Sequence, residues 1–425
     1  MGFGLQKPTD EPGAAWPAIM VGMFAAFAGI LYGYDTGTIS GIQTMDYWKK
    51  EFDNPSEDKI SLIVSILSVG TFFGALAAGL LADWTGRRWG IILSAAIPFN
   101  LGVALQTAAT EQKMFIAGRA FAGFGVGLVS VQIPMYQAES LPKWIRGFVI
   151  GSYQLAITIG LLLASLVNYG TENRDDSGSY RIPLAIQFAW SIILCVGMFI
   201  LPETPRFLIK VGKEQQAIKS LQFLRRLPAD HPGLVGEFEE IQGNWEYEKS
   251  LGKASYIECF QGNLGKRTIT GIVLQSLQQL VGVNFIFYYG TSYFSQVITN
   301  VVNVVTTFPG LYAIDKFGRR FVLLSGALGM GICQYIVAAC GVATTQDNSA
   351  SQGAQFAFHF RPGGMVVTGE IFPLKARAKC LSMTTAANWF FNWLLAFITP
   401  YLEGKQYANL GSNVFWIWGG FCWIA

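Results

Sequence analysis

The sequence predicts an all-α polytopic membrane protein built from two similar halves. Of its 425 residues, 52% are hydrophobic and only 13% are charged, whereas about 25% of residues are charged in an average soluble protein. The mean hydropathy is +0.37. The 14% aromatic content and the 48 glycines fit helices that pack closely in lipid. These values exclude an ordinary soluble domain.

Two motifs occur twice in the chain, with nearly the same separation. The pattern Asp-x-x-Gly-Arg-Arg occupies Asp83–Arg88 and again Asp315–Arg320, 232 residues later (315 − 83). The pattern Glu-x-x-Pro-x-x-x-Arg occupies Glu139–Arg146 and again Glu370–Arg377, 231 residues later (370 − 139). Because two unrelated patterns share one offset to within a residue, we infer that the chain contains a duplicated unit.

The first half is expected to contribute six membrane spans, each long enough for a hydrocarbon core of about 30 Å. The expected spans are Ala15–Thr38, Ile60–Ala82, Trp89–Thr107, Met114–Met135, Phe148–Val167 and Pro183–Leu201. A charged stretch follows, with apolar residues at helical spacing, which predicts a soluble linker of short amphipathic helices. The expected units are an N-terminal half at 1–205, a linker at 206–267 and a C-terminal half at 268–425.

The second half is expected to repeat this pattern less regularly. Its expected spans are Thr268–Phe294, Val297–Ile314, Phe321–Ala343, Leu381–Leu402 and one from Val414 onward, with a weak span before Glu370. Lys and Arg gather in the loops on the side of the repeated motifs and the linker, and the positive-inside rule makes that side cytoplasmic. Both termini are then expected in the cytoplasm, and the plasma membrane is the expected location.

Other classes of protein are excluded by the charged and metal-binding residues. The net charge of +3 is too small to indicate a nucleic-acid partner. Two histidines, His231 and His359, and six cysteines without CxxC spacing argue against a metal site or a catalytic triad. We therefore expect no enzymatic activity, no metal and no cofactor, with the lipid bilayer as the surroundings.

The first span carries a carboxylate, Asp35, among apolar residues. A charge at that depth costs about 2.5 to 3.5 kcal/mol on insertion scales, so it usually faces a partner or a water-filled cavity. Arg119 in the fourth span is the expected partner, because Asp35 lies late in an outward span and Arg119 lies early in an inward one. The pair would either bind and release a proton or serve as a structural ion pair.

The seventh span is rich in amide side chains. These are Gln275, Gln278, Gln279 and Asn284. Amides offer donors and acceptors without charge, which suits the hydroxyls of a sugar, although they could also join helices to one another. A helix loosened at Gly282 would let amides on both sides of it line one cavity. Further candidates in other spans are Gln154, Asn303, Asn388, Trp389 and Asn392.

Motifs along nearly the whole chain resemble one family of transporters. They are Gly33-Tyr34-Asp35-Thr36-Gly37, Asp83–Arg88, Gly118-Arg119, Pro134-x-Tyr136-x-x-Glu139, Pro202-Glu203-Thr204-Pro205-Arg206, Gln278–Asn284, Asp315–Arg320 and Glu370–Arg377. In this order they resemble a sugar porter of the major facilitator superfamily, most similar to fungal hexose transporters. The resemblance implies a fold of two six-helix halves, nominally twelve spans.

The resemblance also implies a function and its residues. The expected activity is transport of a glucose-like hexose by alternating access, by a monomer, with or without a co-transported proton. A sugar sensor and an inactive product are the alternatives. The positions that match the family's hexose contacts are Gln154, Gln278, Gln279, Asn284, Asn303, Trp389 and, nearby, Tyr32. Asp35 and Arg119 match the proton-coupling pair of its symporters, but facilitative relatives also keep this aspartate.

Against that family, three spans of the second half are expected to be shortened or atypical. The eighth has about 18 residues, roughly 27 Å, before Asp315. The tenth contains Arg361 beside Pro362 and two glycines, with Met365 where the family has a tryptophan. The twelfth is expected to be truncated, with about a dozen residues up to Ala425.

The repeated charged motifs are also expected to form a cytoplasmic gate, or else to act only as topology signals. One exposed ion pair contributes about 0 to 1 kcal/mol, whereas moving a two-state equilibrium from 1:99 to 99:1 takes about 5.5 kcal/mol. A gate would therefore need a network of pairs. Its expected members are Asp83, Arg87, Arg88, Glu139, Arg146, Glu203, Arg206, Asp315, Arg319, Arg320, Glu370 and Arg377.

Overall fold

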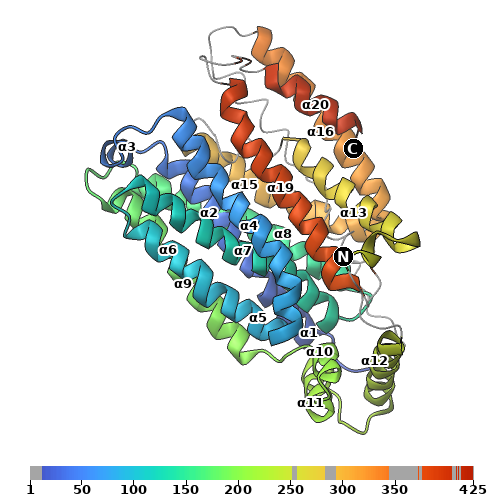
Figure 1. Cartoon of the computed structure of the whole chain (residues 1–425). Coiled ribbons are helices and arrows are strands. Elements are labelled where there is room, and N and C mark those ends of the chain that lie inside the picture. Colours follow the sequence, from blue (N-terminus) through green and yellow to red (C-terminus); the bar gives the residue numbers. More distant parts are fainter. Residues whose placement is uncertain are drawn as a thin grey trace.

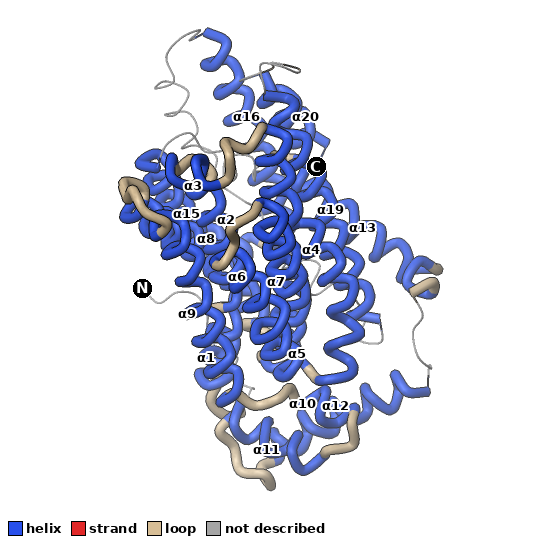
Figure 2. The backbone as a smooth tube through the Cα atoms, turned by 60° about the vertical axis from the view of Figure 1, so that its left-hand side comes forward, coloured by secondary structure: helices blue, strands red, loops and turns tan. Residues whose placement is uncertain are grey.

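The computed structural model describes residues 12–250, 256–282, 293–343, 376–403 and 413–424, with single residues 372, 408 and 410 between them. The ordered elements in these ranges are all helices. Long helices run side by side in a bundle, and the short helices α10 to α12 gather at one end of it (Figures 1 and 2). We call this end the linker side.

The six spans expected in the first half are confirmed. Six stretches between residues 16 and 200 are helical, long and apolar enough to cross a membrane. They are α1 (Trp16–Ala26) with α2 (Ala28–Ile42), α4 (Glu57–Thr85), α5 (Arg87–Ser94) with η1 (Ala95–Phe99) and α6 (Asn100–Thr107), α7 (Gln112–Ser140), α8 (Arg146–Thr171) and α9 (Gly178–Ile200). A short helix, α3 (Asp46–Glu51), lies between the first two spans.

The third span contains an irregular turn with a clear cause. Pro98 lies inside it and cannot donate a backbone hydrogen bond, and its ring would clash with a carbonyl of the preceding helical turn. The backbone widens here into the π-helical turn η1, and such turns are a common way for a helix to accommodate an interruption. The span therefore continues through the proline.

Short helices follow the sixth span, as the sequence predicts. They are α10 (Pro205–Lys210), α11 (Glu214–Arg225) and α12 (Pro232–Ser250), followed by the single turn η2 (Glu258–Phe260). Leu221 and Leu224 are buried, as expected for the apolar face of an amphipathic helix. Ion pairs tie these helices to the spans: Lys210 to Asp83 at 2.7 Å and Lys143 to Glu240 at 2.9 Å.

The eighth span is longer than the sequence suggested. The described helices of the second half are α13 (Gly262–Leu280), α15 (Tyr293–Phe317), α16 (Arg319–Ala343), α19 (Arg377–Glu403) and α20 (Val414–Ile424). Helix α15 has 25 residues, about 37 Å at 1.5 Å per residue, instead of the expected 18. It begins earlier, at Tyr293, and continues past Asp315, because a charged residue at the aqueous end of a helix does not interrupt it. The atypical segment Phe358–Met365 lies outside the described residues.

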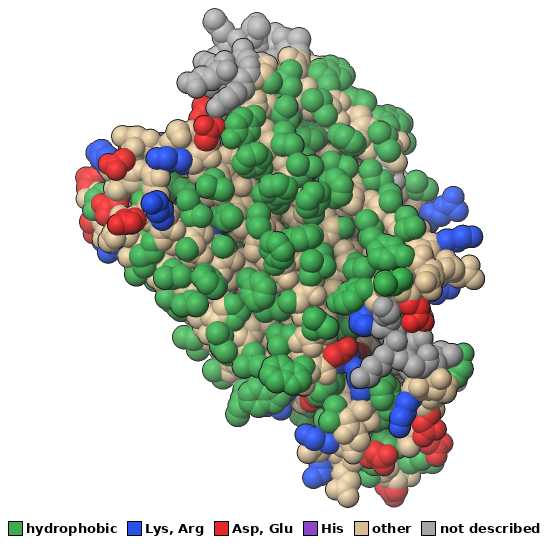
Figure 3. Space-filling model, in the orientation of Figure 1, with side chains coloured by type: hydrophobic (Ala, Val, Ile, Leu, Met, Phe, Trp, Pro, Cys, Tyr) green, Lys and Arg blue, Asp and Glu red, His purple; other side chains and the backbone are tan. Residues whose placement is uncertain are grey.

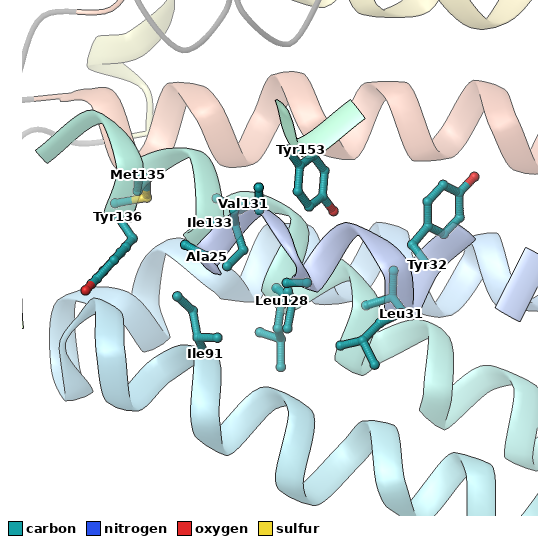
Figure 4. Close-up of a cluster of buried hydrophobic side chains, with 14 of the residues drawn as sticks. Ala25, Leu31, Tyr32, Ile91, Leu128, Val131, Ile133, Met135, Tyr136 and Tyr153 are labelled. Atoms are coloured by element: carbon teal, nitrogen blue, oxygen red, sulfur yellow. The ribbon is translucent and has the colours of Figure 1, made fainter. Parts of the chain in front are cut away.

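Two helix pairs join the first set of spans to the second. Helix α19 packs along α4, and α15 packs along α8 (Figure 1). Near the end opposite the linker, Ser61 donates to the carbonyl of Phe397 at 3.0 Å, and Asn300 donates to Ser165 Oγ at 2.7 Å. The spans also enclose a large apolar core, part of which is drawn in Figure 4.

The outer surface of the bundle matches a lipid environment. Hydrophobic side chains cover the middle of the face seen in Figure 3, while charged side chains gather at the two ends. Large apolar residues such as Phe73, Leu80 and Ile193 are exposed on the spans. A belt of this kind is unstable in water and stable in hydrocarbon. The chain is therefore an integral membrane protein.

Close helix packing predicts a stability effect at Gly33. A Cβ at this position would lie 2.1 Å from the carbonyl oxygen of Ile157 on α8. We expect Gly33→Ala to destabilise the protein by about 1 to 3 kcal/mol, because α2 and α8 must move apart. Gly170→Ala is the control, since nothing lies within 4 Å of a Cβ there. Thermal unfolding of both variants in detergent measures the effect, and equal melting temperatures would contradict it.

Candidate functional site

A buried ion pair between α2 and α7 lies within the first set of spans. Arg119 Nη1 contacts both carboxylate oxygens of Asp35, at 3.0 and 2.9 Å. Both side chains are 0% exposed. Arg119 Nε also donates to the carbonyl of Ile63 on α4, at 3.3 Å. The contact expected from the order of the spans is thus present, and the pair fixes three helices relative to one another.

The electrostatics of this pair depend on burial. Removing two charges from water costs several kcal/mol per ion, and this cost is offset only when the ion pair has good geometry and further hydrogen bonds. Here the desolvation cost is only partly offset, because Arg119 Nη2 is buried and has no hydrogen-bond partner. A carboxylate in such a place is stable only while the arginine faces it. Removing either partner alone would leave an uncompensated charge in the interior.

An amide cluster joins α13 to α19. Gln279 Nε2 donates to Asn388 Oδ1 at 2.7 Å, and Asn388 Nδ2 donates to Gln275 Oε1, also at 2.7 Å. All three side chains are buried. The sequence pattern named all three as candidates, and Gln279 is the one that also matches a hexose contact of the family. These amides meet because α13 packs against α19, a helix about 110 residues further along the chain.

Next to the amides, two aromatic rings meet between the two sets of spans. The rings of Tyr32 on α2 and Trp389 on α19 are 4.8 Å apart and nearly perpendicular. Asn392 Nδ2 lies 3.4 Å from the Tyr32 hydroxyl, to which it donates, and Trp389 Nε1 donates to Ser130 Oγ at 3.3 Å. In Figure 4, Tyr32 projects from the edge of the apolar cluster toward α19. We call Tyr32, Trp389, Ser130 and Asn392 the central cluster.

The other expected sugar contacts are less closely connected. Gln154 on α8 and Gln278 on α13 are half-buried, and Asn303 on α15 is buried. Gln154 makes no side-chain hydrogen bond to another described residue. Asn284 lies outside the described residues.

The expected loosening at Gly282 is present, because α13 ends at Leu280 and Gly282 has a φ of +78°. Ser130, which carries no sequence signal of its own, was not expected at the site.

On the linker side, a compact charged network involves the first repeated motif. Arg87 contacts Glu139, with Nε and Nη2 at 3.1 and 3.0 Å from Oε1, and lies 3.7 Å from Asp83. Glu203 accepts the backbone N–H groups of Arg87 and Arg88 at the start of α5, where a helix has unpaired donors and a partial positive charge. Burial raises the pKa of Glu203, and the backbone N–H groups of Thr204 and Arg88 and the Arg87 guanidinium partly oppose that rise.

Three other arginines of the expected gate behave differently. The Arg88 guanidinium donates to the carbonyls of Met198 and Phe199, while its backbone N–H donates to Glu203. Those carbonyls lie in the last turn of α9, where no intrahelical donor remains for them. Arg146 donates to the carbonyl of Leu141 at 3.2 Å. Arg206 keeps one buried nitrogen, Nη1, without a partner.

The second copy of the charged motifs is only partly described. Arg320 is exposed, and the side chains of Asp315, Arg319, Glu370 and Arg377 lie outside the described part. Near the linker side, α4 and α19 are nevertheless close, since a Cβ on Gly79 would lie 2.8 Å from Ser382 Oγ. The two sets of spans therefore touch at both ends and in the middle.

Comparison with known proteins assigns this arrangement to a family. A family model described as "Sugar (and other) transporter" matches residues 21–425. The chain belongs to this sugar transporter family. It is a family of transporters and not of enzymes. The major facilitator fold, inferred from the motifs, is thereby confirmed.

Relatives within the sugar transporter family include both transporters and a sensor. The chain is 54% identical to the major facilitator-type transporter ecdD of Aspergillus rugulosus, covering 100% of this chain and 86% of the relative. It is 44% identical to a probable glucose transporter, rco-3, of Neurospora crassa, covering 100% and 78%. It is 41% identical to the high glucose sensor RGT2 of Saccharomyces cerevisiae, covering 95% of this chain and 57% of the sensor.

One solved structure supports the same fold. The proton:xylose symporter XylE bound to 6-bromo-6-deoxy-D-glucose superposes with a TM-score of 0.83 at 25% identity, over 97% of this chain and 95% of the symporter. The alignment to the Aspergillus relative spans 465 positions and all of this chain, so about 40 positions of that relative (465 − 425) have no counterpart here.

The buried pair predicts a non-additive stability effect. Arg119→Leu leaves the Asp35 carboxylate buried without its partner, and we expect a loss of about 3 to 5 kcal/mol. The double variant Asp35→Asn with Arg119→Leu removes both charges and should lose clearly less than the two single variants added together. Denaturation of the purified protein in mixed micelles, analysed as a double-mutant cycle, measures the difference, and strict additivity would refute the coupling.

Proposed function

We propose that this protein moves a glucose-like hexose across the membrane by alternating access. The central cluster supports the proposal most directly, because it joins the two sets of spans through an aromatic pair whose polar atoms all have partners. Aromatic faces and amides are the groups that hold a sugar ring and its hydroxyls. The glucose transporter among the relatives favours the same substrate.

Hydrogen-bond exchange gives this site a route to bind sugar. The amides Gln275, Gln279 and Asn388 now satisfy one another, and Ser130 and Asn392 satisfy the aromatic residues. A hexose hydroxyl can donate and accept, so it can replace each of these contacts without leaving a buried group unpaired. We propose that Gln154, Gln278, Asn284 and Asn303 complete the site.

Alternating access requires that contacts between the two sets of spans break in turn. In this proposal residues 1–205 and 268–425 move as two bodies, and residues 206–267 form a cytoplasmic linker that tethers them. The charged network around Arg87 and Glu139, with its second copy in the C-terminal half, closes the cytoplasmic gate. Both termini are cytoplasmic, the protein acts as a monomer, and the plasma membrane is its location.

Proton symport is the second part of the proposal. Protonation of Asp35 would remove the charge that holds Arg119, so the contact between α2 and α7 would respond to a proton. The structural likeness to a proton:xylose symporter favours this choice over facilitated diffusion. A sugar sensor is the alternative function, favoured by the 41% identity to a glucose sensor. In a sensor, the same site would bind hexose without net transport.

Uptake measurements distinguish these functions. In cells that lack their own hexose carriers, we expect the protein to take up labelled glucose, and a protonophore to reduce that uptake. Asn388→Leu should lower uptake at least about tenfold, because Gln275 and Gln279 then lose their partner and a sugar contact is removed. Absence of uptake despite surface expression would favour the sensor, and protonophore-insensitive uptake would contradict symport.

The proposed gate predicts a change in accessibility. Arg87→Gln should open the linker side more often, because Glu139 loses its partner, and should increase labelling of a cysteine placed in the cytoplasmic vestibule about two- to tenfold. Lys143→Gln is the matched control, since its pair with Glu240 is exposed, with 73% and 56% of the two side chains accessible. Neutralising Arg146 and Arg377 together tests both copies of the motif. Equal labelling in all variants would exclude the gate.

A further inference from the structure

Three helices carry polar side chains in stripes that run toward the end opposite the linker side. Within each stripe the residues are three, four or seven positions apart, so they share one side of their helix. The stripes are Tyr32, Thr36 and Ser40 on α2; Gln154, Thr158 and Ser165 on α8; and Gln296, Asn300 and Asn303 on α15. Each stripe contains one expected sugar contact, Tyr32, Gln154 or Asn303, and its other residues continue toward the far end.

The stripes meet where the second set of spans touches the first. Helix α15 packs along α8 (Figure 1). Asn300 Nδ2 donates to Ser165 Oγ at 2.7 Å and lies 3.4 Å from the carbonyl oxygen of Leu161. Further toward the far end, Gln296 Nε2 donates to Ser40 Oγ on α2 at 3.2 Å. We call these contacts the far seam. They join the two sets of spans through neutral side chains alone.

Two polar atoms at the far seam are buried without a partner. Asn300 Oδ1 forms no hydrogen bond, and neither does Thr36 Oγ1, which lies one helical turn from both Tyr32 and Ser40. Asn300 and Thr36 are 5% and 4% exposed. Amides that only join helices are expected to satisfy their polar atoms, because buried polar groups without partners are uncommon and costly. These two acceptors therefore point to a ligand that can donate to them.

The chemistry of the far seam suits a neutral polyhydroxylated molecule. The residues of the three stripes carry hydroxyls and amides and no charge, so nothing in them would balance an ionised ligand. A sugar hydroxyl can donate to Asn300 Oδ1, and a neighbouring one can accept from Nδ2 in place of Ser165. The exchange leaves no amide atom unpaired, whereas parting of Asn300 from Ser165 without a replacement would cost free energy.

We propose that Asn300 and Ser165, with Gln296 and Ser40 beside them, form an outer hexose subsite, separate from the central cluster. When the far seam opens, these side chains bind hydroxyls of the entering sugar, and Thr36 lies between this subsite and Tyr32 of the central cluster. When the seam closes, the same side chains bind one another, as they do in the described structure. This inference rests on the proposed hexose transport and on the proposed orientation, in which the far end faces outward.

Thiol labelling from outside the cell tests the subsite. Ser165→Cys replaces a hydroxyl by a thiol of similar size, and a membrane-impermeant maleimide should modify it when the far seam opens. We expect saturating glucose to slow this modification at least about threefold, because bound sugar excludes the reagent. Glycine betaine at the same concentration has no hydroxyl and should leave the rate unchanged. The unaltered protein gives the background labelling, and Asn300→Cys is the second probe.

A closure driven by sugar at the central cluster could also slow labelling. The measurement is therefore repeated with Asn388→Leu, which removes an amide near the central cluster and leaves the far seam intact. Protection that persists in this background supports an independent subsite. The proposal is overturned if protection disappears with Asn388→Leu, or if glucose protects neither cysteine more than betaine does. It is also overturned if both cysteine variants take up glucose but neither is labelled.

Transport kinetics separate sugar binding from helix packing. Asn300→Leu should raise the KM for glucose uptake about two- to tenfold, because one hydrogen-bonding group toward the sugar is lost. Thr307→Val is the matched control on α15, since the Thr307 hydroxyl already donates to the Asn303 carbonyl of its own helix at 2.7 Å. It should leave KM unchanged. If Asn300 only joins helices, Asn300→Leu lowers the melting temperature or the maximal rate without changing KM, which contradicts the proposal.

Uptake and protection together distinguish this inference from the proposed function. If the wild type takes up glucose and the sugar protects the two cysteines, both stand. If uptake occurs without protection, the outer subsite fails while hexose transport stands. If protection occurs without uptake, the outer subsite stands as a binding site and the transport proposal fails.

Discussion

Hydrocarbon offers no hydrogen bonds, and this constraint governs the whole structure. Each backbone N–H and C=O within the membrane must find its partner inside the protein, which is why the described elements are all helices. The same constraint confines polar side chains to the contacts between helices. The chemistry of the protein is therefore located at helix interfaces, and each functional group is also a packing group.

The consequence is clearest where glycine allows helices to approach closely. At Gly33 the backbones of α2 and α8 nearly touch, while Asp35, two residues later, is fully buried between α2 and α7. A charge there needs a partner from another helix, and Arg119 supplies it. Helix α2 thus packs closely on one neighbour, α8, and forms its ion pair with another, α7.

The two sets of spans are held together by a different kind of contact. Hydrogen bonds between neutral groups, such as Asn300 with Ser165 and Trp389 with Ser130, are weak individually and can be exchanged for water or sugar at little net cost. Among the residues that the structure describes, the ion pairs lie within the first set of spans and its linker. None of these pairs joins the two sets, so movement between the sets does not by itself separate them.

Sequence alone determined the helical class, the duplication, the six spans of the first half and the Asp35 and Arg119 pair. These features follow from apolar run length, repeat spacing and the cost of an intramembrane charge, all of which are local or periodic. The length of α15 and the role of the Arg88 guanidinium were not predictable in the same way, because they depend on where helices end relative to water and to α9.

Only the tertiary structure decided which polar groups meet. Ser130 has no distinctive sequence pattern, since a serine in an apolar run is equally compatible with simple helix packing, and the sequence does not show which partner the candidate amide Asn388 meets. Their significance comes from neighbours contributed by other helices: Trp389 for Ser130 and Gln279 for Asn388. The sequence specifies the donors and acceptors, but their pairing depends on the rotation and depth of each helix, which packing sets.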